Sequence, residues 1–295
     1  MISREISPPL LAVRGLSKHF PLQAGGFRRK IVGVTRAVDA VSFEIASGET
    51  LGLVGESGSG KTTTARCILR ALTPSSGEVW LRLPDHRTVD LAQLSDRELT
   101  PLRVHAQMVF QDPYSSLNPR MTVGEIVGEP LVIHRLARGR ELEARVVQML
   151  ESVGLKADHR ARYPHAFSGG QRQRIGIARA LIMRPSLLVC DEATSALDVS
   201  VQAQVLDLLK GLQRQFQLTY LFVAHNLDVV RNFCDRVAVM RQGRIVELAA
   251  TTQIFSAPQH PYTKLLLSAV PSPDPDVRMN FSLGDELARL DGRGA

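Results

Sequence analysis

A glycine-rich segment, flanked by an apolar run and a helical pattern, constrains the fold of this chain more than any other feature. Residues 55–63 read GESGSGKTT, which fits the phosphate-binding pattern Gly-x4-Gly-Lys-Thr in full. The nearly continuous apolar run Thr50–Val54 before it is typical of a central parallel strand, and residues 61–70 after it predict a helix. Glycines let successive backbone N–H groups face a phosphate, and the following helix start adds the positive end of its dipole. The segment therefore predicts a nucleotide-binding P-loop in an α/β fold.

The side chains of this loop have distinct expected roles in binding a nucleotide. Lys61 is expected to reach the β- and γ-phosphates, and the Thr62 hydroxyl is expected to bind Mg²⁺. A glycine-rich turn without a ligand is the alternative, and the strand before the loop and the helix after it argue against that alternative. The predicted nucleotide-binding residues of the loop are Gly55, Ser57, Gly58, Ser59, Gly60, Lys61, Thr62 and Thr63.

Two acidic residues follow a second apolar run, which covers residues 187–190. An acid that ends a buried strand can hold Mg²⁺, directly or through water, at the sheet edge where ligands of open α/β sheets bind. A neighbouring acid can orient and deprotonate an attacking water. An apolar run that ends in Asp-Glu is common by itself. Its position after the P-loop makes Asp191 a candidate metal ligand and Glu192 a candidate catalytic residue.

A third segment, Ser168-Gly169-Gly170-Gln171, stands directly before a helical pattern. A small hydroxyl and two glycines at a helix start expose N–H groups that can bind an anion. The alternative is an N-cap serine followed by flexible glycines, and composition alone favours that alternative.

Short β-rich runs alternate with longer helical patterns, which argues for a largely parallel sheet. Residues 121–184 look like a helical subdomain inserted in the α/β core. A short helix is expected from His260 to Val270, and the proline-rich tail from Pro271 is expected to be extended or disordered. Further strands are expected at 11–13, 41–45, 79–81, 108–110 and 220–224, a hairpin at 237–247, and helices at 122–134, 141–153, 171–183 and 201–217.

The composition is that of a globular protein, with 44% hydrophobic residues in 295 and a net charge of +7. No apolar run approaches the roughly 18–20 residues of a membrane-spanning helix, and no secretory signal is evident. The three scattered cysteines form neither a disulfide framework nor a metal cluster, so we expect a reducing, cytosolic compartment. The basic charge fits solvated surfaces, an anionic membrane or nucleic acid, and its scattered arrangement favours the first.

Over residues 10–250, these motifs resemble those of the nucleotide-binding subunits of ATP-binding-cassette (ABC) transporters. The segment FSGGQRQRIGIARAL resembles the signature motif of that family and the helix after it. Gln111 in VFQDP matches the Q-loop glutamine, Asp198 in SALD matches the D-loop, and His225 in LFVAHN matches the switch histidine. Phe20 is a candidate for the aromatic residue that stacks on adenine.

This resemblance implies a P-loop NTPase core with a mostly parallel sheet, an antiparallel β subdomain and an inserted α-helical subdomain. It implies ATP and Mg²⁺ as cofactors. The implied catalytic residues are Glu192, His225 and Gln111, and the implied Mg²⁺ ligands are Thr62, Gln111 and Asp191. Two subunits would pair head-to-tail, so that the ATP on one P-loop also meets the helix start of the other subunit at Ser168, Gly169, Gly170 and Gln171. Asp198 is a further implied nucleotide-binding residue.

Each matched residue has a structural alternative. Gln111 would otherwise be an ordinary loop amide, and His225 a hydrogen-bonded structural histidine. Asp198 would otherwise cap the helix that follows it. Phe20 would otherwise be a core aromatic, and about 16 residues separate it from Ala37, where the next family-like segment begins.

A second resemblance narrows the subfamily. The segments VFQDPYSSLNPRMTVGEI and SAPQHPYTKLLLSAVPSPDP are similar to ATPase subunits of oligopeptide/dipeptide importers, and nickel and glutathione importers share the HPYT ending. Residues 10–250 would form the ATPase domain, and 251–295 a C-terminal extension. Some members carry cysteines for an iron–sulfur cluster in this extension, but the chain has none after Cys234, so we expect no cluster.

The resemblance implies the energy-coupling subunit of a bacterial importer, located at the cytoplasmic face of the inner membrane. Its implied partners are a second ATPase subunit, identical or related, two membrane permeases and an extracytoplasmic substrate-binding protein. A nucleic-acid-handling ATPase is the rival class, but the chain lacks the coiled-coil insertion, the cysteine-rich zinc modules and the second cassette of such relatives. We therefore expect no nucleic-acid partner, and the cargo stays open.

Overall fold

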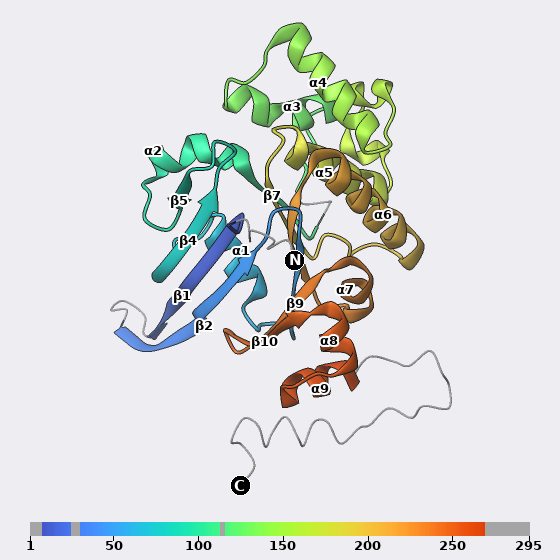
Figure 1. Ribbon diagram of the computed structural model, residues 1–295. Helices are drawn as coiled ribbons and strands as arrows, with labels where there is room; N and C mark the ends of the chain where they lie inside the picture. The colour runs from blue at the N-terminus through green and yellow to red at the C-terminus, as the bar shows by residue number, and fades with distance from the viewer. Residues whose placement is uncertain (1–7, 25–29, 113–115, 269–295) are drawn as a thin grey trace, which may run out of the picture.

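The computed structural model of the protein describes residues 8–24, 30–112 and 116–268. Within these residues the strands form two sheets, and helices pack around them (Figure 1). The predicted α/β fold, with a mostly parallel sheet, an antiparallel sheet and inserted helices, is confirmed.

The larger sheet has the strand order β10-β9-β3-β8-β7-β6. Pairing is parallel from β9 to β6, and β10 joins β9 as an antiparallel hairpin. Every residue of β3, β7 and β8 is buried, as expected for parallel strands that are covered on both faces. The strands are β3 (Thr50–Val54), β6 (Ala106–Val109), β7 (Leu187–Asp191), β8 (Thr219–Ala224), β9 (Arg236–Arg241) and β10 (Arg244–Ala250).

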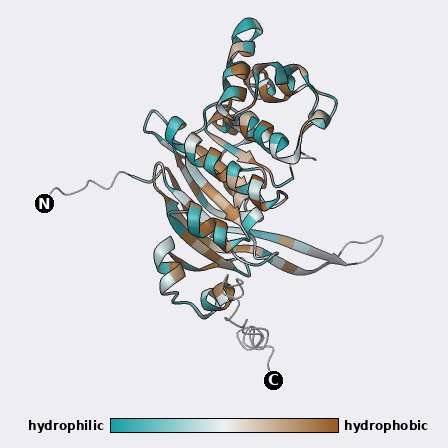
Figure 2. Ribbon diagram, turned by 90° about the vertical axis from the view of Figure 1, so that its right-hand side faces the viewer, coloured by the Kyte–Doolittle hydropathy of each residue, from teal (hydrophilic) through white to brown (hydrophobic). Residues whose placement is uncertain are grey.

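The smaller sheet is antiparallel, in the order β2-β1-β4-β5. Its first two strands continue past the sheet as a long two-stranded ribbon, which projects from the body of the molecule (Figure 2). The strands are β1 (Leu11–Ala24), β2 (Lys30–Ile45), β4 (Ser76–Arg82) and β5 (Thr88–Asp90).

The helices connect these strands and separate into groups. The pair α3 and α4 packs on α5 at the end of the molecule farthest from α8 and α9 (Figure 1). The α-helices are α1 (Lys61–Ile68), α2 (Asp96–Leu99), α3 (Val123–Ile133), α4 (Gly139–Ser152), α5 (Gly169–Leu181), α6 (Val199–Phe216), α7 (Leu227–Phe233), α8 (Thr251–Ser256) and α9 (Pro261–Ser268).

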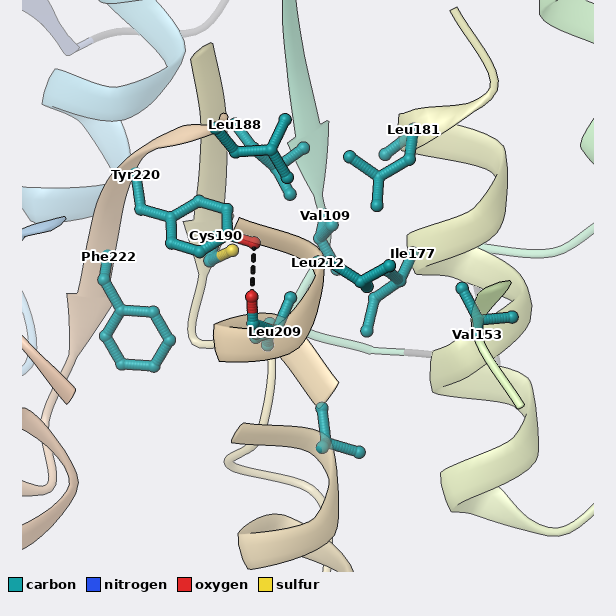
Figure 3. Packing of buried hydrophobic residues seen from close by; sticks show 14 of the residues in the cluster. Val109, Val153, Ile177, Leu181, Leu188, Cys190, Leu209, Leu212, Tyr220 and Phe222 are labelled. Carbon is teal, nitrogen blue, oxygen red and sulfur yellow. Dashed lines mark hydrogen bonds between the residues drawn. The ribbon is translucent and has the colours of Figure 1, made fainter. Parts of the chain in front are cut away.

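The two faces of the larger sheet face two different hydrophobic cores. Leu188 and Tyr220 point to the face covered by α5 and α6, where they lie near Leu209 of α6 and Ile177 of α5 (Figure 3). The alternate residues, such as Leu221, point to the core shared with α1 and the smaller sheet. This alternation follows from the two-residue repeat of a strand. The carboxyl ends of the strands are thereby held in one rigid edge between two packed layers.

The structure differs from the sequence predictions mainly at β1, β2, α7 and α8. The sequence predicted only 11–13 and 41–45 of the long ribbon strands, because the residues between them lack a regular apolar alternation. Strand β5 and helices α2, α7 and α8 were not predicted either, since three to seven residues are too few for a periodic pattern. The predicted helix end at Val270 and the tail from Pro271 lie outside the described residues. The units 10–250, 121–184 and 251–295 remain predictions.

Candidate active site

Four loops that carry predicted site residues leave the larger sheet at the same edge. Gly55 follows β3, Asp191 ends β7, His225 follows β8 and Gln111 lies just after β6. These strands are parallel and in register, since Val54 pairs with Ala224 and Asp191 pairs with Val223. Residues that are far apart in the sequence therefore meet at the carboxyl edge of the sheet.

The P-loop follows a path that two of its glycines make possible. Gly55 has φ of 152°, and a Cβ atom there would lie 2.1 Å from the carbonyl oxygen of Met240. Gly60 has φ of 106°, and a Cβ atom there would lie 2.1 Å from the carbonyl oxygen of Ala37. Any side chain at either position would collide with backbone that cannot move aside. The loop is thereby fixed between β9 and β2, with α1 directly after it.

Lys61 lies inside the loop and is only 4% exposed. Its Nζ atom donates to the carbonyl oxygens of Gly55 and Glu56, both at 2.8 Å. It also contacts the Ser59 hydroxyl at 3.4 Å. Burial lowers the pKa of Lys61, and the nearby carboxylates of Glu192, Asp191 and Glu56 partly oppose this change. Among the described residues, the hydrogen-bond partners of the ammonium group are oxygens of the loop itself and not acidic side chains.

Thr62 and Asp191 form a pair of oxygen ligands beside the loop. The Thr62 hydroxyl donates to Oδ1 of Asp191 at 2.8 Å. Asp191 is 2% exposed, and its burial raises the pKa of the carboxyl group, against the effect of the Thr62 hydrogen bond. Hydroxyl and carboxylate oxygens suit Mg²⁺, which commonly binds few protein oxygens and completes its coordination with phosphate and water. The donor set therefore fits the predicted ion.

The Glu192 carboxylate is held between two predicted catalytic side chains. Its Oε2 atom accepts a hydrogen bond from Nε2 of Gln111 at 2.9 Å and lies 3.1 Å from Nδ1 of His225. Glu192 has φ of 48°, an uncommon value for a residue with a side chain, and its N–H donates to the Val223 carbonyl at 3.0 Å. The sharp turn after β7 thus aims the carboxylate at the edge of the sheet.

The Ser-Gly-Gly-Gln segment begins helix α5. Ser168 is its N-cap: the hydroxyl accepts from the Gln171 N–H, and the Ser168 N–H donates to Oε1 of Gln171. A Cβ atom at Gly170 would lie 2.4 Å from Cγ1 of Val201, so Gly170 permits close packing on α6. Gly169 is the first residue of the helix. Among the described residues, these hydrogen bonds of Ser168 stay within the first turn of α5.

Asp198 caps the neighbouring helix α6. Its Oδ1 atom accepts from the Val201 N–H at 2.9 Å and from the Ser200 hydroxyl at 2.7 Å. The Val201 hydrogen bond is the main cause of a lowered pKa for Asp198. Within one subunit, Asp198 therefore caps helix α6, as the structural alternative in the sequence analysis stated.

Phe20 lies on β1, in the antiparallel sheet. It pairs with Thr35 of β2, two residues before Ala37, whose carbonyl approaches Gly60. Its side chain is 38% exposed, and Nζ of Lys18 lies 5.1 Å from the ring centroid. Phe20 is thus an accessible aromatic and not a core residue.

Tyr262, which sequence analysis did not place in the site, touches the P-loop. The Tyr262 hydroxyl accepts a hydrogen bond from the Glu56 N–H at 3.2 Å. The Arg241 guanidinium lies 5.0 Å from the centroid of the Tyr262 ring. Together with Glu56–Ser59 and Gln242 these residues line a hollow of about 170 Å³. The HPYT motif contains Tyr262, but in the sequence analysis the motif indicated only the subfamily and not that Tyr262 lies against the P-loop.

Comparison with known proteins places these features in a family context. Residues 38–195 match the family described as ABC transporter, and residues 246–290 match the family described as Oligopeptide/dipeptide transporter, C-terminal region. The oligopeptide transport ATP-binding protein OppF of Bacillus subtilis is 51% identical over 272 residues, which cover 92% of this chain and 85% of OppF. The glutathione import ATP-binding protein GsiA of Salmonella paratyphi A is 50% identical over 267 residues, which cover 90% of this chain and 42% of GsiA.

Solved structures agree with the sequence matches. A dimeric post-hydrolysis state of the ATP-binding cassette MJ0796, bound to ADP and Pi, superimposes with a TM-score of 0.69 at 29% identity. The superposition covers 82% of this chain and 98% of the cassette.

Proposed function

Because the chain belongs to the ABC transporter family, we propose that this ATP hydrolase is the energy-coupling subunit of a bacterial importer of oligopeptides or dipeptides. The observation that carries the cargo class is the similarity to OppF, which extends through the C-terminal region as well as the ATPase core. A glutathione importer is the second candidate, because GsiA is nearly as similar. A nickel importer is a further alternative from the HPYT ending.

The P-loop contacts support a binding role that involves a switch of partners. Lys61 Nζ bonds to the carbonyl oxygens of Gly55 and Glu56. We propose that the β- and γ-phosphates of ATP replace these carbonyls as acceptors, because a charged acceptor gives a stronger hydrogen bond than a neutral one. The loop N–H groups and the start of α1 would hold the phosphates from the other side. Phe20, exposed on the adjoining sheet, is proposed to stack on the adenine.

The oxygen atoms of Thr62 and Asp191 are proposed to hold Mg²⁺, with Gln111 as a third ligand. Bound Mg²⁺ would neutralise charge on the phosphate oxygens. Gln111 donates its amide N–H to Glu192, so the amide oxygen remains for the ion. One side chain would thereby connect the metal ligands with the catalytic carboxylate.

Glu192 is proposed to act as the general base. A carboxylate that is oriented by Gln111 and His225 can accept the proton of an attacking water. His225 is proposed to help orient that carboxylate, and its Nδ1 atom, 3.1 Å from Oε2 of Glu192, supports this role.

We further propose that the active unit is a dimer of cassettes, since the MJ0796 cassette was solved as a dimer in its post-hydrolysis state. The helix start at Ser168–Gln171, of which Ser168 is exposed, and the Asp198 loop would then meet ATP held by the opposing P-loop. The proposed partners are an identical or related ATPase subunit, two membrane permeases and an extracytoplasmic binding protein, with this chain at the cytoplasmic face of the membrane. Within the described part of the chain, no helix has the length and apolar character needed to cross a membrane.

Uptake measurements test this function. A strain that lacks the gene is complemented with the wild type or with Glu192→Gln, and uptake of a labelled tripeptide, labelled glutathione and Ni²⁺ is compared. We expect tripeptide uptake to require the wild-type chain. Restoration of glutathione or nickel uptake alone would reassign the cargo. ATPase stimulation by DNA or RNA at physiological salt, with no uptake defect, would favour the nucleic-acid class.

A further inference from the structure

A tyrosine of the C-terminal segment is buried against the P-loop. Tyr262 lies in the first turn of α9, is 1% exposed, and is separated from Glu56 by 206 residues in the sequence. Its hydroxyl oxygen accepts the hydrogen bond of the Glu56 N–H. Burial raises the pKa of Tyr262, so the hydroxyl remains neutral at physiological pH.

Helix α9 is docked by specific contacts on β10. The Glu247 carboxylate accepts from the N–H groups of Gln259 at 2.8 Å and His260 at 3.0 Å. The Tyr262 N–H donates to Nδ1 of His260 at 3.1 Å. These bonds satisfy the N–H groups that enter the helix, and Pro261 needs no such partner. The position of Tyr262 is therefore set by the docking of α9 and not by the P-loop alone.

The peptide groups on either side of Glu56 are held from two directions. Lys61 bonds the Glu56 carbonyl, and Tyr262 bonds its N–H. If the phosphates of ATP accept the hydrogen bonds of the Lys61 ammonium, the hydrogen bond from Lys61 to the Glu56 carbonyl is lost. The Tyr262 contact does not involve any group that phosphate would compete for at Lys61, so it can hold the loop before and after ATP binds.

We propose that Tyr262 is a positioning residue of the nucleotide site, through which the docked C-terminal helix sets the affinity of the P-loop for ATP. This inference rests on the proposed use of the P-loop for ATP. Without the hydroxyl, the Glu56 N–H loses its partner, and the free loop samples more conformations that must be ordered when ATP binds. The segment matched to the oligopeptide/dipeptide C-terminal region thereby gains a role at the ATP site.

The test compares two tyrosines that each lose only a hydroxyl group. Tyr262→Phe keeps the ring and removes the bond to Glu56. Tyr220→Phe is the matched control, because Tyr220 is also buried and its hydroxyl donates to the Leu209 carbonyl at 2.9 Å, in the core under α6 (Figure 3). Isothermal titration with ATP and with ADP gives Kd, steady-state phosphate release gives KM and kcat, and thermal unfolding gives Tm.

We expect Tyr262→Phe to weaken binding of both nucleotides by about three- to tenfold, the range of one lost hydrogen bond. KM should rise with kcat within about twofold, since the bond is made in the ground state and the transition state alike. Tyr220→Phe should lower Tm and leave Kd unchanged. If Tyr262→Phe lowers Tm as the control does and leaves both Kd values unchanged, Tyr262 is structural and the proposal is wrong.

A second variant tests transmission through α9. Glu247→Gln weakens the docking of the helix start without touching the P-loop, and we expect a smaller loss of ATP affinity in the same direction. An unchanged ATP affinity in Glu247→Gln would contradict control by helix docking. Lys61→Ala separates these outcomes from failure of the proposed function. If the wild type binds no ATP, or if its affinity for ATP is no higher than that of Lys61→Ala, the P-loop itself was misassigned.

Discussion

Replacement of Glu192 by glutamine should separate ATP binding from ATP hydrolysis. The substitution keeps the size of the side chain and removes its negative charge. In the structure, one carboxylate oxygen meets two groups, Nε2 of Gln111 at 2.9 Å and Nδ1 of His225 at 3.1 Å. A glutamine amide can accept at its oxygen but places an N–H₂ group where the second carboxylate oxygen stood, and it cannot take a proton from water.

The size of the effect follows from the loss of a general base. Such a base contributes typically about 10²–10⁴-fold to a rate, which corresponds to about 3–5 kcal/mol of barrier at about 1.4 kcal/mol per tenfold. The phosphate contacts are expected to survive, because Lys61 bonds Gly55, Glu56 and Ser59 and none of its hydrogen bonds involves Glu192. We therefore expect kcat to fall by at least about a hundredfold while Kd for ATP stays within about threefold.

The assay pairs phosphate release with nucleotide binding and size-exclusion chromatography. With hydrolysis blocked, ATP with Mg²⁺ should shift the Glu192→Gln variant to a dimer. Glu141→Gln is the control, since Glu141 is an exposed residue of α4 whose carboxylate pairs with Arg145, and it should change neither rate nor binding. Turnover of Glu192→Gln within about threefold of the wild type would refute the assignment of Glu192 as the base.

Three further variants examine other parts of the site. Lys61→Ala should weaken ATP binding at least tenfold in a nucleotide titration, because the ammonium group offered to the phosphates is deleted; an unchanged Kd would remove the loop from the ATP site. Gly169→Glu should leave ATP binding to the single subunit within about twofold but block hydrolysis, since a charged side chain would stand at the helix start; normal hydrolysis would argue against a composite site. Asp198→Ala should lower Tm by removing the cap on the Val201 N–H. The pKa of Asp198 is lowered, so the charged cap stabilises the protein above the ordinary pKa of about 3.8, and this stabilisation is lost as the pH falls through the folded-state pKa. The difference in Tm between wild type and Asp198→Ala should therefore shrink in acid. A difference that stays constant with pH would contradict the ionic part of the cap.

Sequence patterns predicted the core strands and the P-loop well, because both depend on consecutive residues. Thr50–Val54 forms β3 with the predicted limits, and helix α1 begins at Lys61 as predicted. The apolar run before Asp191 forms β7, which includes that residue. Short, nearly continuous apolar runs bounded by turn residues are typical of buried strands in a parallel sheet, and the glycine spacing of the loop allows few backbone paths.

Helices α5 and α6 were predicted to begin at 171 and 201, two residues after their observed starts, and the sequence pattern did not decide between the alternative roles of their first residues. Ser168 and Asp198 cap α5 and α6 in the structure, as their simpler alternatives stated. Capping does not contradict a role toward a second subunit, since an N-cap side chain at an exposed helix end uses only part of its hydrogen-bonding capacity. The capping hydrogen bonds of Ser168 and Asp198 form within one chain, whereas the ATP that they are proposed to meet would be bound by the opposing subunit.

The sequence by itself therefore determined the local elements: the loop that must curve, the strands that must be buried and the helices that must begin at their caps. Only the tertiary structure decided which side chains meet. Glu192 lies beside Gln111, 81 residues earlier, and beside His225, 33 residues later, because β6, β7 and β8 end at one edge of the sheet. Tyr262 reaches Glu56 across 206 residues because α9 docks on β10. Local conformation follows from the preferences of neighbouring residues, whereas contacts over such distances depend on the order and register of strands, which no short segment of the chain encodes.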